Sequence, residues 1–147
     1  MLSPEMTAFM EGVRRRRSEL RQAMGDLERA LARPANPEWI GRVRQALDRM
    51  HSDLRAHVVA SEGADGLYAQ ILADAPHLSA RVEHLVREHE ALAAAIAALV
   101  TAAESDSPDV SALRADATDF LVRLSRHRQA GSDLMFDAYD LDVGGET

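Results

Sequence analysis

Residues 76–103 read PHLSARVEHLVREHEALAAAIAALVTAA and contain a pattern that recurs through the chain. A proline stands first, where its missing N–H would have no helical partner anyway. Apolar residues then recur at helical spacing and form one stripe: Val82, Leu85, Leu92, Ile96 and Leu99. This stretch therefore predicts a long amphipathic helix that buries one face against other helices.

Three more segments repeat this order of a polar cap, a proline and an apolar stripe. Their starts are Ser3-Pro4-Glu5, Asn36-Pro37-Glu38 and Ser107-Pro108-Asp109. We predict helices over residues 4–33, 37–62, 76–103 and 108–139. Because short links favour antiparallel neighbours, the expected fold is all-α, an antiparallel up-down-up-down four-helix bundle. The length of 147 residues suits one domain, which we expect to span residues 1–147.

Composition agrees with a helical core and excludes several kinds of functional site. Aromatic residues make up only 4% of the chain, so the core must consist mainly of aliphatic side chains, which suits helix packing. The absence of cysteine excludes disulfides, zinc–thiolate sites, iron–sulfur clusters and a cysteine nucleophile. A formal net charge of -7 argues against nucleic acid as a partner, although residues 14–17 form a local run of arginines.

Hydropathy argues against a membrane partner. The longest apolar stretch, Ala91 to Val100, is too short to cross a bilayer, which takes about 20 residues. The N-terminal residues lack the apolar core of a signal peptide. From these features we expect a cytoplasmic protein.

Two segments depart from the helical pattern. Residues 61–66, SEGADG, contain two glycines, which are unfavourable inside a helix, before an apolar pattern resumes at Leu67. We expect a break here, followed by a short helical piece. The tail from Asp140 to Thr147 contains Gly144-Gly145, and we expect it to fray or to lie along the surface.

Three of the six histidines lie on or beside the apolar stripes of three different helices. His57 follows Leu54 by three residues, His89 lies between Leu85 and Leu92, and His127 follows Leu124 by three. Each alone is explained by a hydrogen-bonded core position. Together they could converge at one level of the bundle, where imidazoles on facing helices build metal sites. His84 falls on the opposite face and should point to solvent.

The stretches around these histidines resemble the hemerythrin-like, or HHE cation-binding, domains. The matching strings are LRAH at 54–57, REHEAL at 87–92 and LSRH at 124–127, with SEG at 61–63, GLY at 66–68, DLMFDAY at 133–139 and DVGG at 142–145. The resemblance implies a four-helix bundle that holds a non-haem di-iron centre, used for oxygen binding or sensing, iron handling or redox stress. For this chain we expect non-haem iron, as one or two ions. The resemblance also implies metal ligands at His57, Glu62, His89 and His127.

The chain departs from that family pattern at several ligand positions. Arg17 aligns with the expected histidine of the first helix, and Leu85 replaces a second histidine of the third. The carboxylate positions of the second and fourth helices fall on Ser61 and on 131–132, which are Gly-Ser. Glu62 lies one residue after the expected carboxylate position. On a straight helix one residue rotates the side chain by about 100°, so Glu62 reaches inward only if the helix is distorted. Asp133 is a poorer candidate for the same reason.

Arg17 allows two interpretations. Its guanidinium could project into the site, replace a metal ion as the cation and pair with Glu62. Alternatively, it could extend to the surface with its neighbours in the arginine run. The sequence thus predicts a non-enzymatic binding or sensing module with an incomplete iron site and a metal ion or small ligand in its centre. The alternative is a metal-free bundle of the same family that acts as an interaction or regulatory module with a protein partner.

Overall fold

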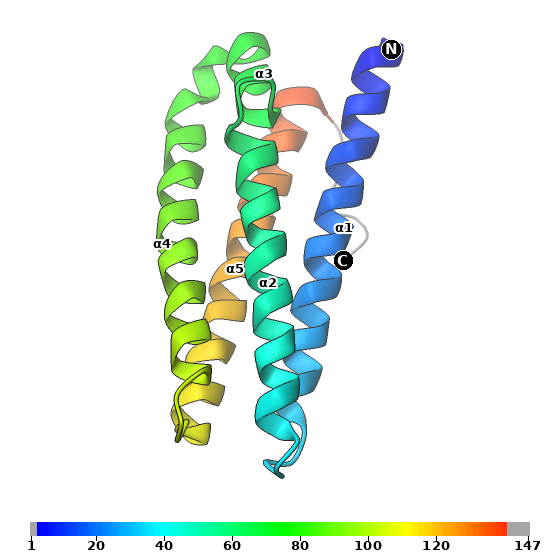
Figure 1. Cartoon of the computed structure of the whole chain (residues 1–147). Coiled ribbons are helices and arrows are strands. Elements are labelled where there is room, and N and C mark those ends of the chain that lie inside the picture. Colours follow the sequence, from blue (N-terminus) through cyan, green and yellow to red (C-terminus); the bar gives the residue numbers. More distant parts are fainter. Residues whose placement is uncertain (1–2, 141–147) are drawn as a thin grey trace.

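The computed structural model describes residues 3–140, and over that range its regular elements are all helices, joined by short links. The elements in chain order are α1 (Pro4–Ala32), α2 (Trp39–Glu62), α3 (Leu67–Asp74), the 3-10 helix η1 (Pro76–Leu78), α4 (Ser79–Ala103) and α5 (Val110–Tyr139). The four long helices run alternately up and down, with α3 and η1 joining α2 to α4 at one end (Figure 1). The predicted all-α, antiparallel four-helix bundle is confirmed.

Side-chain caps mark where α1 and α5 begin. The Ser3 Oγ accepts a hydrogen bond from the Met6 N–H at 3.1 Å, so α1 starts as predicted, with Pro4 in its first turn. The prediction was wrong by two residues for α5, because Asp109 is the cap rather than a residue of the first turn. Its carboxylate accepts from the Ala112 N–H at 3.0 Å. Likewise α2 begins two residues after Pro37, at Trp39.

The predicted break after α2 is present, and close backbone packing accounts for its glycines. A Cβ on Gly63 would lie 2.8 Å from the carbonyl oxygen of Val59, and one on Gly66 would lie 2.5 Å from that of Ala60. Only glycine fits so near these carbonyls. The short helix α3 follows, as expected. Toward the C-terminus α5 ends at Tyr139 with Asp140 as its C-cap, and the remainder of the predicted tail lies outside the described residues.

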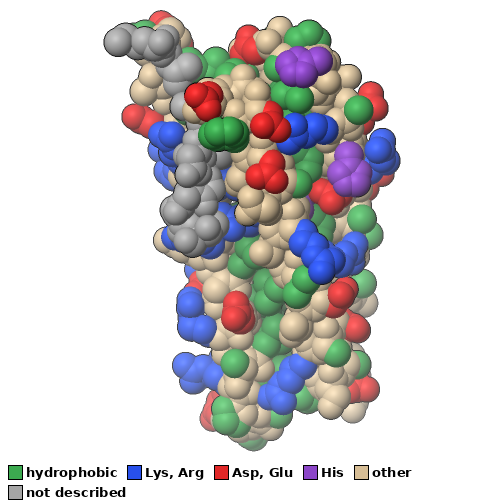
Figure 2. Space-filling model, turned by 180° about the vertical axis from the view of Figure 1, so that it is seen from behind, with side chains coloured by type: hydrophobic (Ala, Val, Ile, Leu, Met, Phe, Trp, Pro, Cys, Tyr) green, Lys and Arg blue, Asp and Glu red, His purple; other side chains and the backbone are tan. Residues whose placement is uncertain are grey.

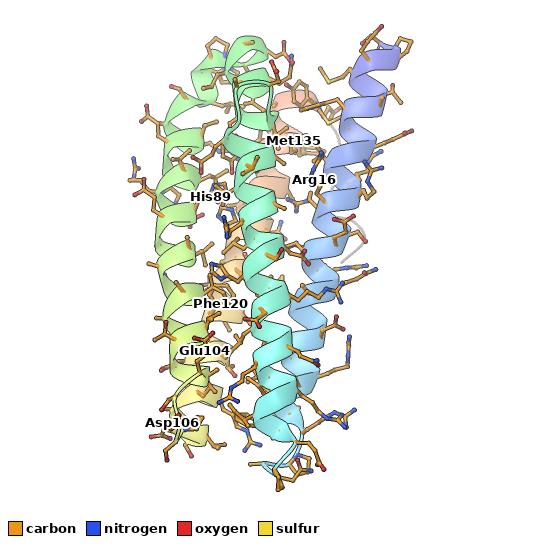
Figure 3. The ribbon with its side chains drawn as sticks, viewed as in Figure 1. Arg16, His89, Glu104, Asp106, Phe120 and Met135 are labelled. Carbon is orange, nitrogen blue, oxygen red and sulfur yellow. The ribbon has the colours of Figure 1, made fainter. Side chains whose placement is uncertain are left out.

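The core consists of two apolar clusters at different heights. The larger includes Leu47, Leu92 and Phe120, and the smaller includes Ile71 and Met135. His89 projects from α4 into the bundle at a height between Phe120 and Met135 (Figure 3). Five buried polar residues belong to neither cluster: Arg17, Ser61, His89, His127 and Arg128. Together with His57 they form what we call the polar layer.

The outer surface is strongly polar. Acidic and basic side chains are interspersed along the face shown in Figure 2. Surface ion pairs include Arg49 with Asp53 along one helix and Arg81 with Asp137 between α4 and α5. Within residues 3–140, no helix is long and apolar enough to cross a membrane.

Candidate metal centre

Three imidazoles from three helices meet in the polar layer, as the sequence predicted. The ring centroids of His57 and His89 are 5.1 Å apart, those of His57 and His127 are 5.6 Å apart, and those of His89 and His127 are 4.7 Å apart. One ring nitrogen of each lies within 4.8 Å of the others. Among the described residues this is the one group of histidine and acidic side chains arranged so as to hold a metal ion.

Glu62 fixes the orientation of His89. The Nδ1 of His89 lies 2.5 Å from the carboxylate of Glu62, and the imidazole is only 2% exposed. A carboxylate accepts hydrogen bonds, so the proton of the neutral ring is on Nδ1 and Nε2 carries the lone pair. Glu62 is therefore a hydrogen-bond partner of a candidate ligand in this structure and lies outside the cluster of three histidines.

Glu88 fixes the orientation of His127 in the same way. Its carboxylate accepts from the Nδ1 of His127 at 2.8 Å, which again leaves Nε2 with a lone pair. The other oxygen of Glu88 lies 3.4 Å from Nε2 of His84, whose side chain is 63% exposed, as predicted. A carboxylate behind a histidine is the usual arrangement in metal sites, where it fixes the tautomer and raises the basicity of the ligand nitrogen.

His57 contributes a buried nitrogen that forms no hydrogen bond with any described residue. This nitrogen is Nε2. Burial lowers the pKa of His57 well below 6.5, and the charges of His89, His127, Arg17 and Arg128 lower it further. Burial also lowers the pKa of His127, against the opposing effect of its bond with Glu88. Both rings are thus neutral at pH 7 and able to bind a cation.

Tyr68 covers the cluster on the side of α3. Its ring stacks on His89 with centroids 5.7 Å apart and an angle of 14° between the planes. Its hydroxyl lies 3.4 Å from Nε2 of His89 and donates to the lone pair there. Burial raises the pKa of Tyr68, so the phenol keeps its proton.

Arg17 projects inward rather than to the surface. It is 5% exposed, and its Nη2 donates to the carbonyl oxygen of Arg128 at 3.0 Å and to the hydroxyl of Ser132. A Cβ on Gly131 would lie 3.3 Å from Nη1 of Arg17, so the glycine provides room for the guanidinium. The contact with the backbone of Arg128 places Arg17 beside His127. The carboxylate of Glu62, the partner suggested by the sequence, contacts His89.

The structure also places the carboxylate candidates of the second and fourth helices. Ser61, at a position where the family pattern has a carboxylate, is 4% exposed and donates to the carbonyl oxygen of His57 at 2.8 Å. Asp133 points away from the cluster and accepts from Gln129 at 3.0 Å. Sequence reasoning missed Glu88, which lies four residues after His84 on the side of the helix expected to face solvent. The available signal was its position directly before His89.

Comparison with known families identifies the class of protein. The family model described as "Hemerythrin HHE cation binding domain" matches residues 10–139. No curated protein and no solved structure matches the chain. Because the family model covers most of the chain, this protein belongs to the hemerythrin HHE cation-binding family.

The residues of the polar layer fit a cation only in part. Three imidazoles, two of them hydrogen-bonded to carboxylates, and the buried Nε2 of His57 suit a metal ion. A pair of iron ions takes roughly five or more protein ligands, including bridging carboxylates, as in di-iron bundles. The cluster supplies three nitrogens and no carboxylate, and the inward side chain of α1 is Arg17. The set fits one ion and does not fit two.

Proposed function

We propose that this chain is a non-enzymatic binding or sensing module that holds a metal cation on His57, His89 and His127, at an iron site left incomplete by Arg17. The observation that carries the proposal is the pair of carboxylate–imidazole contacts, Glu62 with His89 and Glu88 with His127. They leave Nε2 of both rings as the nitrogen that can bind a cation. On His89 the metal would replace the hydroxyl of Tyr68, which lies 3.4 Å from that nitrogen. Non-haem iron is the metal that the family resemblance suggests.

The surroundings of the cluster support binding rather than catalysis on an organic substrate. The polar layer is enclosed between two apolar clusters. The cavity that borders Arg17 and His57 has a volume of about 40 Å³, whereas sites for small organic molecules usually take ~300 Å³ or more. Such a cavity admits water or a diatomic molecule. We also propose that residues 1–147 form one domain.

Metal analysis tests this function directly. The full chain is freed of metal with a chelator, then titrated with Fe(II) without oxygen and, separately, with Zn(II). We expect saturable binding that His57→Ala, His89→Ala and His127→Ala each weaken by at least tenfold, because they share one site. His77→Ala is the matched control, since His77 is exposed on η1. Metal-free protein that stays folded and binds neither ion would refute the proposal.

A metal-free interaction or regulatory module is the second candidate, and the inward position of Arg17 favours it. A buried guanidinium can serve as the permanent cation of a polar layer. In that case the three histidines are core residues, and their alanine variants should lose stability independently. Their effects on the free energy of unfolding would then be unrelated to added metal.

A further inference from the structure

Building on the metal binding proposed above, we infer that the centre holds one transition-metal ion on three imidazole nitrogens, and that Arg17 closes the α1 side against a second ion. Each imidazole comes from a different helix, α2, α4 or α5. The fourth long helix, α1, contributes Arg17 at this height. The ligands therefore approach from three sides, and the fourth side carries a cation.

Arg17 cannot act as a ligand. A guanidinium has five N–H donors and no accepting lone pair, and it stays protonated in proteins. Its Nη2 donates to the backbone of Arg128 and to Ser132, and Gly131 lies close to Nη1. This position on α5 has no side chain beyond hydrogen. The guanidinium therefore occupies space that a longer residue at 131 would fill.

The positive charge of Arg17 acts on the cluster itself. The guanidinium of Arg17 lies beside His127, through its contact with the backbone of Arg128. A positive charge at this place disfavours a second divalent ion on the α1 side of the cluster. One ion on the three imidazole nitrogens is the arrangement that this position of Arg17 permits.

The ligand type selects the metal. Imidazole nitrogen suits Fe(II), Co(II), Ni(II), Cu(II) and Zn(II), whereas Mg(II), Ca(II) and Mn(II) prefer oxygen. Metal–nitrogen bonds of about 2.1 Å bring ligand nitrogens to roughly 3.4 Å from one another in a tetrahedral site. The three nitrogens lie within 4.8 Å of one another, so binding must bring the most distant pair closer by up to about 1.4 Å. Three protein ligands leave a fourth position for water or a small molecule.

The experiment is a titration of the metal-free full chain with Co(II), followed by visible absorption. We expect saturation at one equivalent per chain and no displacement of Co(II) by excess Mg(II) or Ca(II). Saturation at two equivalents would overturn the inference while leaving the proposed function intact. No binding of Co(II), Zn(II) or Fe(II) would refute the function as well.

Variants test the role of Arg17 separately. Arg17→Gln removes the charge without adding a metal ligand, and Arg17→His removes it and adds a fourth imidazole. We expect Arg17→His to bind Co(II) at least tenfold more tightly than Arg17→Gln, with circular dichroism reporting the fold of each. Arg14→His, on the exposed side of α1, is the matched control and should bind like the wild type. Equal affinity of the two Arg17 variants would overturn the role assigned to Arg17. If they fail to fold, the stoichiometry of the wild type still decides the number of ions.

Discussion

Glu62 and Glu88 contact the two most deeply buried imidazoles without belonging to the cluster of ligand nitrogens. Replacing either with glutamine keeps an oxygen that can accept from Nδ1 but removes the negative charge. Because such partners raise ligand basicity, we expect Glu62→Gln and Glu88→Gln each to weaken metal affinity by about 10–100-fold. Isothermal titration calorimetry measures the loss. Glu83→Gln, exposed on α4, is the control, and an equal loss there would contradict the assignment.

Protonation of the histidines makes the metal-free protein sensitive to acid. The pKa of His57 is lowered by burial, by His89 and His127, and by Arg17 and Arg128. In the unfolded chain it returns to about 6.5, so below that pH the unfolded state takes up a proton that the folded state does not. The free energy of unfolding should therefore fall as pH drops from 7 to 5.5.

Urea denaturation of the chelated protein at several pH values measures this fall. His57→Leu removes the main titrating group and should show a shallower fall, whereas His77→Ala should behave like the wild type. A free energy of unfolding that is constant between pH 7 and 5.5 would contradict the lowered pKa.

The link between α2 and α3 gives a prediction at the scale of one element. A Cβ on Gly66 would meet three backbone carbonyl oxygens at 2.5 to 3.0 Å, so Gly66→Ala forces the backbone to move. We expect it to destabilise the protein by about 1–3 kcal/mol. Gly41→Ala is the matched control. Nothing lies within 4 Å of a Cβ there, and the exposed position within α2 should gain up to ~1 kcal/mol.

Thermal denaturation of the two glycine variants measures both effects. A Gly66→Ala protein as stable as the wild type would show that the link relaxes without cost. The same variant also tests the site, because the link follows directly after Glu62. We expect its metal affinity to fall together with its stability.

Sequence patterns located most elements because they depend on local chemistry. Ser3 and Pro4 start α1, and the stripe from Val82 to Leu99 fixes the buried face of α4. The inward histidines follow from the same stripes. Sequence patterns do not predict how far each helix is rotated about its axis relative to its neighbours. The contact of Glu88 with His127 across α4 and α5 depends on that rotation, and so does the approach of Arg17 to the backbone of Arg128.

Metal binding should stabilise the whole bundle, since the ligands come from three helices that separate on unfolding. If the ion binds only the folded state, a free ion concentration of 100 times its dissociation constant adds about 2.7 kcal/mol to the free energy of unfolding. For a domain of this size that raises the melting temperature by roughly 5–10 °C. Differential scanning calorimetry of the metal-free protein with and without Zn(II) measures the shift. His89→Ala should abolish it, and a shift that persists in this variant would place the ion elsewhere.

The polar layer also divides the apolar core into two compartments that share the same helices. The larger compartment contains Trp39 and Phe120, and the smaller contains Met10, Ile71 and Met135. Each compartment is held together by its own buried surface, so the two ends of the bundle can open separately. Backbone amides around the smaller compartment should exchange with deuterium sooner than those around the larger one. An ion bound between them would join the compartments, and the two exchange rates would then converge.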